Sequence, residues 1–245
     1  MPLSLDLTGR VALVTGGTRG IGLGITEAFR AAGARVLTCS RSEVDVPDHH
    51  VCDVTDPEAV RALVDRVVAD AGRLDVLVNN AGGAPSAEAA TASPRFHDKV
   101  VGLNLLGPLL VSQAANAVMQ QQAGGGSIVN ISSVSASRPA PTIAAYAAAK
   151  AGLDSLTTSL AVEWGPLVRV NAIDVGLCRT EQTDDHYGDD ARVAAIEATI
   201  PLGRMARPDE VGHLAVFLAS DLASYVSGAR VACHGGGEPP VFLHV

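Results

Sequence analysis

The sequence predicts an α/β protein whose single domain is built on a parallel, doubly wound sheet. Three observations predict this fold. Short apolar runs alternate with longer helical patterns, a glycine-rich turn follows the first run, and 47% of the 245 residues are apolar while 18% are charged. Strands that alternate with helices are typical of parallel sheets, whose ligands bind beyond the carboxyl ends of the strands. We therefore expect the functional residues at those ends.

The elements follow one another in a regular order along the chain. Apolar runs predict buried strands, and apolar residues at helical spacing predict the helices between them. The expected strands cover 11–15, 36–39, 74–78, 127–131, 168–172 and 229–233, with a short one before Asp53, and the expected helices cover 20–32, 57–71, 95–121, 145–163 and 208–219. The segment between Arg41 and Val51 is too short for a helix with its loops, which predicts an open adenine side.

One long tract, 176–207, shows no regular pattern and is rich in Asp, Arg and Pro. An irregular insertion of this length is typical of a lid or substrate loop, and a solvated surface loop is the alternative. The paired acids 184–185 and 189–190 are interpreted as solvated loop charge. Residues 1–245 are therefore expected to form one domain, with 176–207 as its lid.

Charge and composition favour small-molecule chemistry. The net charge of -8 and the pI near 5.3 disfavour nucleic acid or an anionic membrane as the main partner. No uninterrupted apolar run approaches the ~20 residues of a spanning helix, and the first residues lack a basic and apolar leader, so a cytoplasmic protein is expected. The four cysteines, Cys39, Cys52, Cys178 and Cys233, are scattered, so neither a metal site nor a disulfide is predicted.

Tyr146 and Lys150 lie one helical turn apart, and Ser133 precedes them in a serine-rich stretch. A phenol titrates near pH ~10, and a nearby ammonium is expected to lower that pKa. Lys99 and Lys150 are the only lysines of the chain, which otherwise uses arginine. An arginine fork does not replace a compact ammonium. The trio is therefore a candidate for proton transfer, although for the lysine taken by itself chance placement is the better explanation.

Glycines follow the first expected strand in the run Thr15-Gly16-Gly17-Thr18-Arg19-Gly20-Ile21-Gly22. Glycines allow a tight turn and a close approach of a pyrophosphate to the N-terminus of the next helix. An ordinary strand-to-helix turn is the alternative. The position of this run after the first strand, together with the proton-transfer trio, favours a dinucleotide site.

In ordered motifs over nearly its whole length, the chain resembles the single-domain short-chain dehydrogenases/reductases of about 250 residues. The glycine run resembles their cofactor turn, Asn79-Asn80-Ala81-Gly82 their fourth-strand motif, and Ser133 with Tyr146-x-x-x-Lys150 their active site. Two departures are Asp174-Val175-Gly176, where Pro-Gly is common, and His234, where Asp is common. The resemblance implies catalytic residues Asn104, Ser133, Tyr146 and Lys150, and cofactor contacts at Gly16, Thr18, Arg19, Gly20, Ile21, Gly22, Ser40, Arg41, Asp53, Val54, Asn80, Ala81, Gly82, Tyr146, Lys150, Gly176, Cys178 and Thr180.

The charges after the second strand favour NADP(H) over NAD(H). An NAD site presents a carboxylate there to the ribose hydroxyls, whereas this chain has Ser40 followed by Arg41. Arg19, from the glycine turn, is expected to meet Arg41 on a 2'-phosphate. Two solvated surface arginines are the alternative.

The expected reaction moves a hydride between nicotinamide and a carbonyl or secondary alcohol. Tyr146 would give the proton, Ser133 would hold the substrate oxygen, and Lys150 would tune the phenol and bond the ribose. By resemblance, Asn104 anchors a proton-relay water. The alternatives are a non-catalytic NADP-binding regulator, which usually loses the tyrosine or the lysine, and an epimerase or dehydratase, for which the chain lacks room.

Residues 140–143, with Leu177 and 181–205, are expected to line an apolar pocket that suits a 3-oxoacyl thioester or a cyclic ketone. His97, His186 and His213 are expected to lie away from Tyr146. A homotetramer is expected by resemblance, with the apolar tail 238–245 as a candidate for packing on a neighbouring subunit. Substrate identity and reaction direction do not follow from the residues.

Overall fold

Seven parallel strands form one sheet in the order β3-β2-β1-β4-β5-β6-β7. This computed structural model describes residues 5–181, 183 and 187–237. The order places β1 between β2 and β4, so the direction of winding reverses there, as in doubly wound folds. The strands are β1 (Val11–Thr15), β2 (Arg35–Ser40), β3 (His49–Val51), β4 (Val76–Asn79), β5 (Gly126–Ser133), β6 (Val168–Val175) and β7 (Arg230–Cys233).

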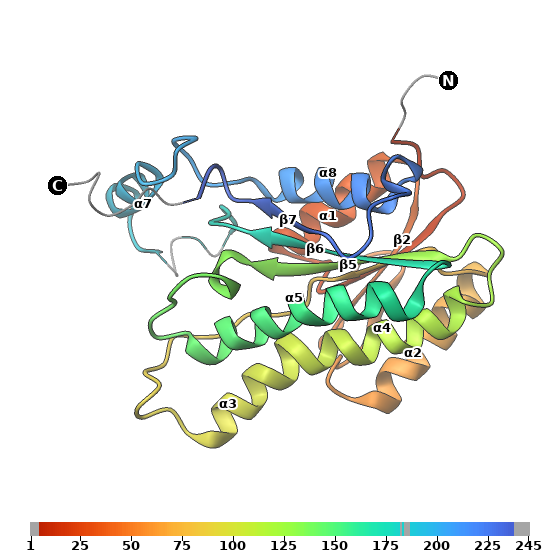
Figure 1. Cartoon of the computed structure of the whole chain (residues 1–245), viewed down its shortest axis with the longest axis horizontal. Coiled ribbons are helices and arrows are strands. Elements are labelled where there is room, and N and C mark those ends of the chain that lie inside the picture. The colour runs from red at the N-terminus through yellow and green to blue at the C-terminus, as the bar shows by residue number, and fades with distance from the viewer. Residues whose placement is uncertain (1–4, 182, 184–186, 238–245) are drawn as a thin grey trace.

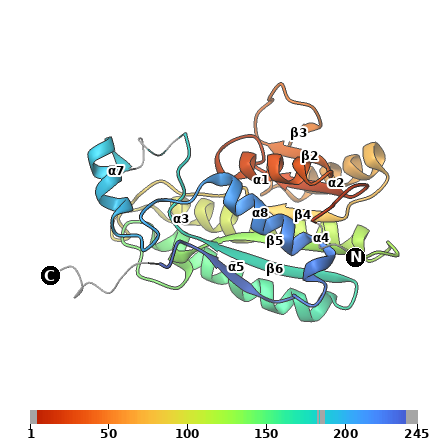
Figure 2. The same ribbon diagram turned by 90° about the horizontal axis from the view of Figure 1, so that it is seen from above.

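Helices cover both faces of the sheet, as Figures 1 and 2 show. On one face lie α1 (Gly20–Ala31) and α8 (Pro208–Ala219), and on the other lie α2 (Pro57–Ala71), α4 (Gly107–Met119) and α5 (Ala144–Trp164). The strands are buried between the two layers, which explains why they are apolar runs rather than alternating ones. The α/β, doubly wound, single-domain fold expected from the sequence is therefore confirmed.

The helix expected over 95–121 is divided into three parts. It runs through α3 (Pro94–Val101), a π-helix at Gly102–Leu106 and α4. A π-helical turn is typical of functional positions. Here it contains Asn104, whose side-chain amide donates to the Val100 carbonyl at 2.9 Å and so takes part in the irregular turn.

The tract 176–207 is not irregular throughout, contrary to the expectation. It contains the helix α7 (Asp190–Glu197), which begins where the Asp189 carboxylate accepts a hydrogen bond from the Arg192 amide at 3.0 Å. A carboxylate in this position caps the free amides of a helix. The Asp189-Asp190 pair is therefore a helix start rather than loop charge, and the pair at 184–185 lies outside the described residues.

The helical stretch Pro94–Met119 is long and apolar enough to cross a membrane by length and composition alone, and its most apolar 18-residue window has a mean hydropathy of 1.3. No such stretch was expected, because the apolar residues of this one are interrupted by polar ones. Within α4, Val111, Ala115 and Met119 are fully buried against the sheet. The apolar side of α4 is thus used to form the core of the domain.

Glycines bring α1 and α8 unusually close together. A Cβ atom placed on Gly212 of α8 would lie 2.6 Å from the Gly24 carbonyl oxygen and 2.7 Å from the Ala28 Cβ. Side chains at this contact would push the two helices apart. Since α1 begins at the glycine turn, this packing helps to hold that turn at the end of β1.

Candidate active site

The turn between β1 and α1 has the backbone conformation that its glycines predict. Gly16 and Gly20 have φ angles of +63° and +52°, in the left-handed region that favours glycine. A Cβ on Gly22 would collide with the Gly16 carbonyl oxygen. Thr18 and Ile21 lie half-buried within the turn, and Arg19 is exposed. The turn is therefore tight enough for a phosphate to reach the N-terminus of α1.

A carboxylate already occupies part of this helix end. The Gly20 amide donates to Oε1 of Glu181 at 3.0 Å, and Glu181 comes from the expected lid tract. An amide at a helix N-terminus attracts anions, and a cofactor phosphate would seek the same donor. The Gly20 amide at this turn therefore binds an anionic side chain, Glu181.

Thr15 joins the glycine turn to the motif that follows β4. Its buried hydroxyl accepts hydrogen bonds from the Asn80 and Ala81 amides, both at 3.0 Å. The Asn80 side chain donates in return to the Thr15 and Gly16 carbonyls at 2.9 and 3.1 Å. Asn80 therefore braces the turn, and Thr15, which opens the glycine motif but was not among the expected cofactor contacts, joins the two motifs.

Gly82 lies between two of the expected catalytic side chains. A Cβ at this position would lie 2.7 Å from Oδ1 of Asn104 and 3.4 Å from Nζ of Lys150. Asn104 itself is fully buried and bonds both backbone groups of Gly83: its Oδ1 accepts from the amide at 2.8 Å, and its Nδ2 donates to the carbonyl at 2.9 Å. The structure therefore brings Asn104 and Lys150 to the same point beyond β4.

Lys150 is buried, with 3% of its surface exposed. Its ammonium donates to the Ile131 carbonyl of β5 at 2.7 Å and lies 5.6 Å from the centroid of the Tyr146 ring. Burial lowers the pKa of Lys150 to about 8, against a partly compensating charge from Asp154. The lysine is therefore placed under the tyrosine, as the one-turn spacing predicts.

Ser133, at the end of β5, contacts the half-buried Tyr146 of α5. Burial raises the pKa of the Tyr146 phenol, while its hydrogen bond with Ser133 acts in the opposite direction and the nearby Tyr187 adds to the rise. The expected lowering by Lys150 is therefore not what this structure has. The reason is that the ammonium is directed at the Ile131 carbonyl, so burial of the phenol dominates.

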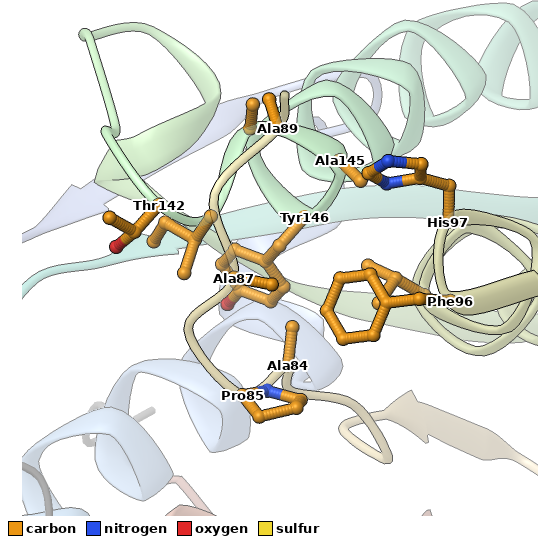
Figure 3. Close-up of a pocket in the computed structure, with 12 residues that line it drawn as sticks. Ala84, Pro85, Ala87, Ala89, Phe96, His97, Thr142, Ala145 and Tyr146 are labelled. Carbon is orange, nitrogen blue, oxygen red and sulfur yellow. The ribbon is translucent and has the colours of Figure 1, made fainter. Parts of the chain in front are cut away.

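A small cavity adjoins Tyr146, as Figure 3 shows. Its volume is about 10 Å³, room for about one water molecule. Thr142 and Ile143 line it, as expected for residues 140–143, and His97 lines it as well, contrary to the expectation that His97 lies away from Tyr146. The remaining wall comes from Ala84, Pro85, Ala87 and Ala89, in a segment for which no element was expected, with Phe96 and Val100 of α3 and Ala144 and Ala145 of α5.

The end of β2 holds Ser40 against His49 of β3. The His49 ring nitrogens lie 3.0 Å from the Thr38 hydroxyl and 3.2 Å from the Ser40 hydroxyl, which also donates to the Ser42 carbonyl at 2.9 Å. The exposed Arg41 guanidinium is close enough to Asp53 to help lower the pKa of that carboxyl, which the Thr55 backbone amide lowers most. Ser40, Arg41 and Asp53 therefore share one corner of the sheet, and no helix separates β2 from β3 in the described chain.

The segment after β6 places Gly176 and Cys178 beside the C-terminal glycines. A Cβ on Gly176 would lie 2.7 Å from the Cβ of His234, and the Gly176 amide donates to the Cys233 carbonyl at 3.0 Å. Burial raises the pKa of the Cys178 thiol to about 12, which makes it a poor nucleophile. The Thr180 amide donates to the Thr183 hydroxyl at 2.8 Å.

Within the described ranges, no group of three or more His, Cys, Asp or Glu side chains is placed to hold a metal ion. Val54, next to Asp53 in the sequence, is buried against Gly107 at the start of α4. His186 lies outside the described residues. His213, on α8, lines no part of the cavity next to Tyr146. The contacts of Thr15, His49 and Glu181 were not predicted, because each is made with an element distant in the sequence.

Comparison with known proteins agrees with this geometry. A family model described as enoyl-(acyl carrier protein) reductase matches residues 16–238. The chain belongs to the short-chain dehydrogenase/reductase family. It is 40% identical to D-threitol dehydrogenase of Mycolicibacterium smegmatis, over 96% of each chain. It is 38% identical to a 3-oxoacyl-(acyl-carrier-protein) reductase of Thermotoga maritima, over 95% of this chain and 99% of the relative.

A solved structure from Beutenbergia cavernae is also similar. It is named as an NAD(P)-dependent gluconate 5-dehydrogenase with NADP bound at low occupancy, and it is 38% identical with a TM-score of 0.88, over 96% of this chain and 98% of that one. The relatives are oxidoreductases of small molecules, and their names span polyols, sugar acids and acyl thioesters. This chain is therefore an oxidoreductase of that family, built to bind a nicotinamide cofactor.

Proposed function

We propose that this protein is an NADP(H)-dependent carbonyl reductase or alcohol dehydrogenase. The observation that carries the proposal is the meeting of Ser133, Tyr146 and Lys150 at the end of β5, within reach of Asn104 and opposite the glycine turn. When bound, the cofactor supplies or accepts the hydride at the carbonyl carbon. The side chains of the site then have two tasks, which are to bind the substrate oxygen and to transfer its proton.

Each side chain has one task in the proposed reduction. The Ser133 hydroxyl holds the substrate oxygen, and the Tyr146 phenol donates a proton to that oxygen as negative charge develops on it. Because burial raises the pKa of Tyr146, the phenol is protonated at neutral pH and ready to donate. Lys150 would replace the proton from below and bond the ribose, and Asn104 would hold a relay water by analogy with the family.

Preference for NADP(H) rests on the corner around Ser40. No carboxylate occupies the end of β2, and the guanidiniums of Arg19 and Arg41 are both exposed and available to a 2'-phosphate. The neighbouring Asp53 offsets part of the Arg41 charge. Titration of the purified protein with NADPH and with NADH, followed by cofactor fluorescence, tests the preference, and equal or tighter NADH binding would overturn it.

The proposed substrates are carbonyl compounds of an apolar molecule, such as a 3-oxoacyl thioester or a cyclic ketone. Alanine, proline, isoleucine and phenylalanine side chains line the space beside Tyr146, and few polar groups there would bind hydroxyls. The tract 176–207 is proposed as the lid, since its Tyr187 is near enough to raise the pKa of Tyr146. The remainder of 1–245 would form the same single domain.

A panel of carbonyl compounds with NADPH oxidation as the readout tests the proposal. We expect turnover of acyl thioesters or cyclic ketones and little turnover of open-chain sugars, with Tyr146→Phe as the blank. Turnover of ketoses and sugar acids alone would reverse the substrate assignment. No turnover with tight NADPH binding would instead favour the non-catalytic regulator, which the retained Tyr146 and Lys150 argue against.

The proposed assembly is a cytoplasmic homotetramer in which α4 and α5 meet their copies, as in many relatives of this family. Val162 of α5 is 83% exposed and Leu106, just before α4, is 50% exposed, which leaves apolar surface for such contacts. Light scattering of the purified protein measures the assembly directly. A monomer at micromolar concentration would contradict it. The tail 238–245 lies outside the described residues.

A further inference from the structure

Three charged side chains gather behind Lys150, away from the substrate side. Asp154 lies one turn beyond Lys150 on α5, and this spacing puts both side chains on the same face of the helix. Asp174 comes from β6 and Arg230 from β7. Asp154 is 3% exposed and Asp174 is 8% exposed, so both carboxyl groups are buried in the interior.

Arg230 contacts both carboxylates. Its Nε lies 3.1 Å from Oδ2 of Asp154, and its Nη2 donates to Oδ2 of Asp174 at 3.2 Å. Oδ1 of Asp174 and both oxygens of Asp154 are buried without a well-aligned hydrogen-bond donor among the described residues, although Ser132 lies near enough to Asp154 to lower the pKa of its carboxyl. The Arg230 guanidinium supplies positive charge that compensates part of this buried pair.

The charges of this cluster change the pKa of Asp154 and the pKa of Lys150 in different ways. Burial raises the pKa of Asp154 and the Asp174 charge adds to that rise, while a hydrogen bond from Ser132 and, to a smaller degree, the charge of Arg230 oppose it. Asp154 in turn is the carboxylate that favours the charged form of Lys150 against burial. Asp174 serves to hold the Arg230 guanidinium beside Asp154.

We propose that Asp154, whose charged form both Ser132 and Arg230 favour, is a positioning residue that keeps the Lys150 ammonium charged. The titratable and charged groups around Lys150 are Tyr146 and Asp154 on its own helix, with Asp174 and Arg230 behind them. Gly82 and Asn104, which face it from the other side, carry no charge. The inference rests on the proposed function for its catalytic meaning, because only a charged Lys150 carries the proton with which it would resupply Tyr146.

The chain offers a direct test because it has only two lysines. Protein labelled with ¹³Cε-lysine gives two lysine signals, which Lys99→Arg assigns, and the chemical shift of each is followed from pH 6 to 11. We expect Lys150 to titrate near pH 8 in the wild type. Asp154→Asn should lower that midpoint by at least ~0.5 pH unit, since a nearby carboxylate favours the charged lysine. The exposed Lys99 is the internal control.

Two further variants separate a positioning role from a structural one. Asp154→Glu restores a carboxylate and should move the midpoint back toward the wild-type value. Asp174→Asn leaves Asp154 paired with Arg230 and should lower the midpoint by less than Asp154→Asn does. An unchanged Lys150 midpoint in folded Asp154→Asn, or a larger effect of Asp174→Asn, would overturn the inference.

The titration needs neither substrate nor cofactor, so it is independent of the carbonyl panel. A lowered Lys150 midpoint with no turnover of any carbonyl would retain the charge network and reject the proposed reaction. Turnover of a carbonyl with an unchanged Lys150 midpoint would support the proposed reaction and reject the charge network. Once a substrate is known, the alkaline limb of the kcat profile for reduction should move to lower pH in Asp154→Asn, in parallel with the lysine signal.

Discussion

At the scale of single residues, the site is governed by a competition between burial and charge. Tyr146 is held by Ser133, yet burial raises its pKa, whereas burial lowers the pKa of Lys150 to about 8. Both shifts favour the uncharged form, because removing water penalises charge whatever its sign. A site of this kind favours protonated phenol at neutral pH, which is the form needed to reduce a carbonyl.

Tyr146→Phe tests the assigned proton donor. The variant keeps the ring and its packing but removes the acidic proton, so carbonyl reduction should fall by about 10²–10⁴-fold, the usual contribution of a general acid. NADPH binding should change little. The measurement is steady-state NADPH oxidation together with a fluorescence titration, and unimpaired turnover would assign the donor to another group.

Arg41→Ala tests the phosphate corner. Loss of one charge-assisted contact with a 2'-phosphate should weaken NADPH binding by about 10-fold or more and leave NADH binding nearly unchanged. Arg66→Ala, which removes an exposed arginine of α2, is the matched control. If Arg41→Ala weakens both cofactors equally, the guanidinium contacts a part of the cofactor that NADH shares.

At the scale of elements, the strands and most helices followed from apolar pattern, while the interruptions did not. Helix α2 has the bounds expected, since its spacing is regular from Pro57 to Ala71. The π-helix around Asn104 was missed because its cause is a bond from that side chain to a carbonyl of the preceding turn. Helix α7 was missed because one capping aspartate gives little signal in a charged tract.

The residues of the candidate site also fall into two groups, those that the sequence pattern predicts and those that only the fold brings together. Ser133, Tyr146 and Lys150 could be found from spacing along one strand and one helix. The braces Thr15, His49 and Glu181 contact elements far away in the chain, and only folding brings them together. The pKa direction of Tyr146 depends on burial and on where the lysine points, and neither is encoded in a spacing.

Gly212→Ala tests the contact between α1 and α8. The added methyl would press on the Gly24 backbone and Ala28, which should lower the free energy of unfolding by about 1–3 kcal/mol, as overpacking does. Gly102→Ala is the control, because a Cβ there meets open space. Urea denaturation measures both. Equal stability of the two variants would show that the helices separate without cost.

Glu181→Gln tests whether the lid competes with the cofactor for the start of α1. The carboxylate accepts from the Gly20 amide, and such helix-end interactions contribute about 0.3–1 kcal/mol. Removing the charge should therefore tighten NADPH binding by about 2- to 5-fold. Glu163→Gln, an exposed change near the far end of α5, should have no effect. Weaker binding in Glu181→Gln would mean that the carboxylate assists the cofactor.

At the scale of the whole molecule, two apolar layers meet on one sheet, and Lys150 is buried at the edge of one of them. The proposed function requires an ammonium beside this interior, and a buried charge lowers the stability of any fold. The stability of the domain should therefore depend on the protonation of Lys150.

The pKa of Lys150 is about 8 in the folded chain and 10.5 in the unfolded chain. Between these values the unfolded chain binds more protons, so this group makes the folded state more stable as pH rises from 8 to 10.5, by about 3 kcal/mol at most. Lys150→Met has no such dependence. Urea denaturation at pH 7, 8.5 and 10 should therefore show the variant with its largest advantage at pH 7, shrinking steadily toward pH 10. An advantage that stays constant would mean that Lys150 is no harder to protonate folded than unfolded, and taking the difference between the two proteins cancels the opposing titrations of Tyr146 and the buried thiols.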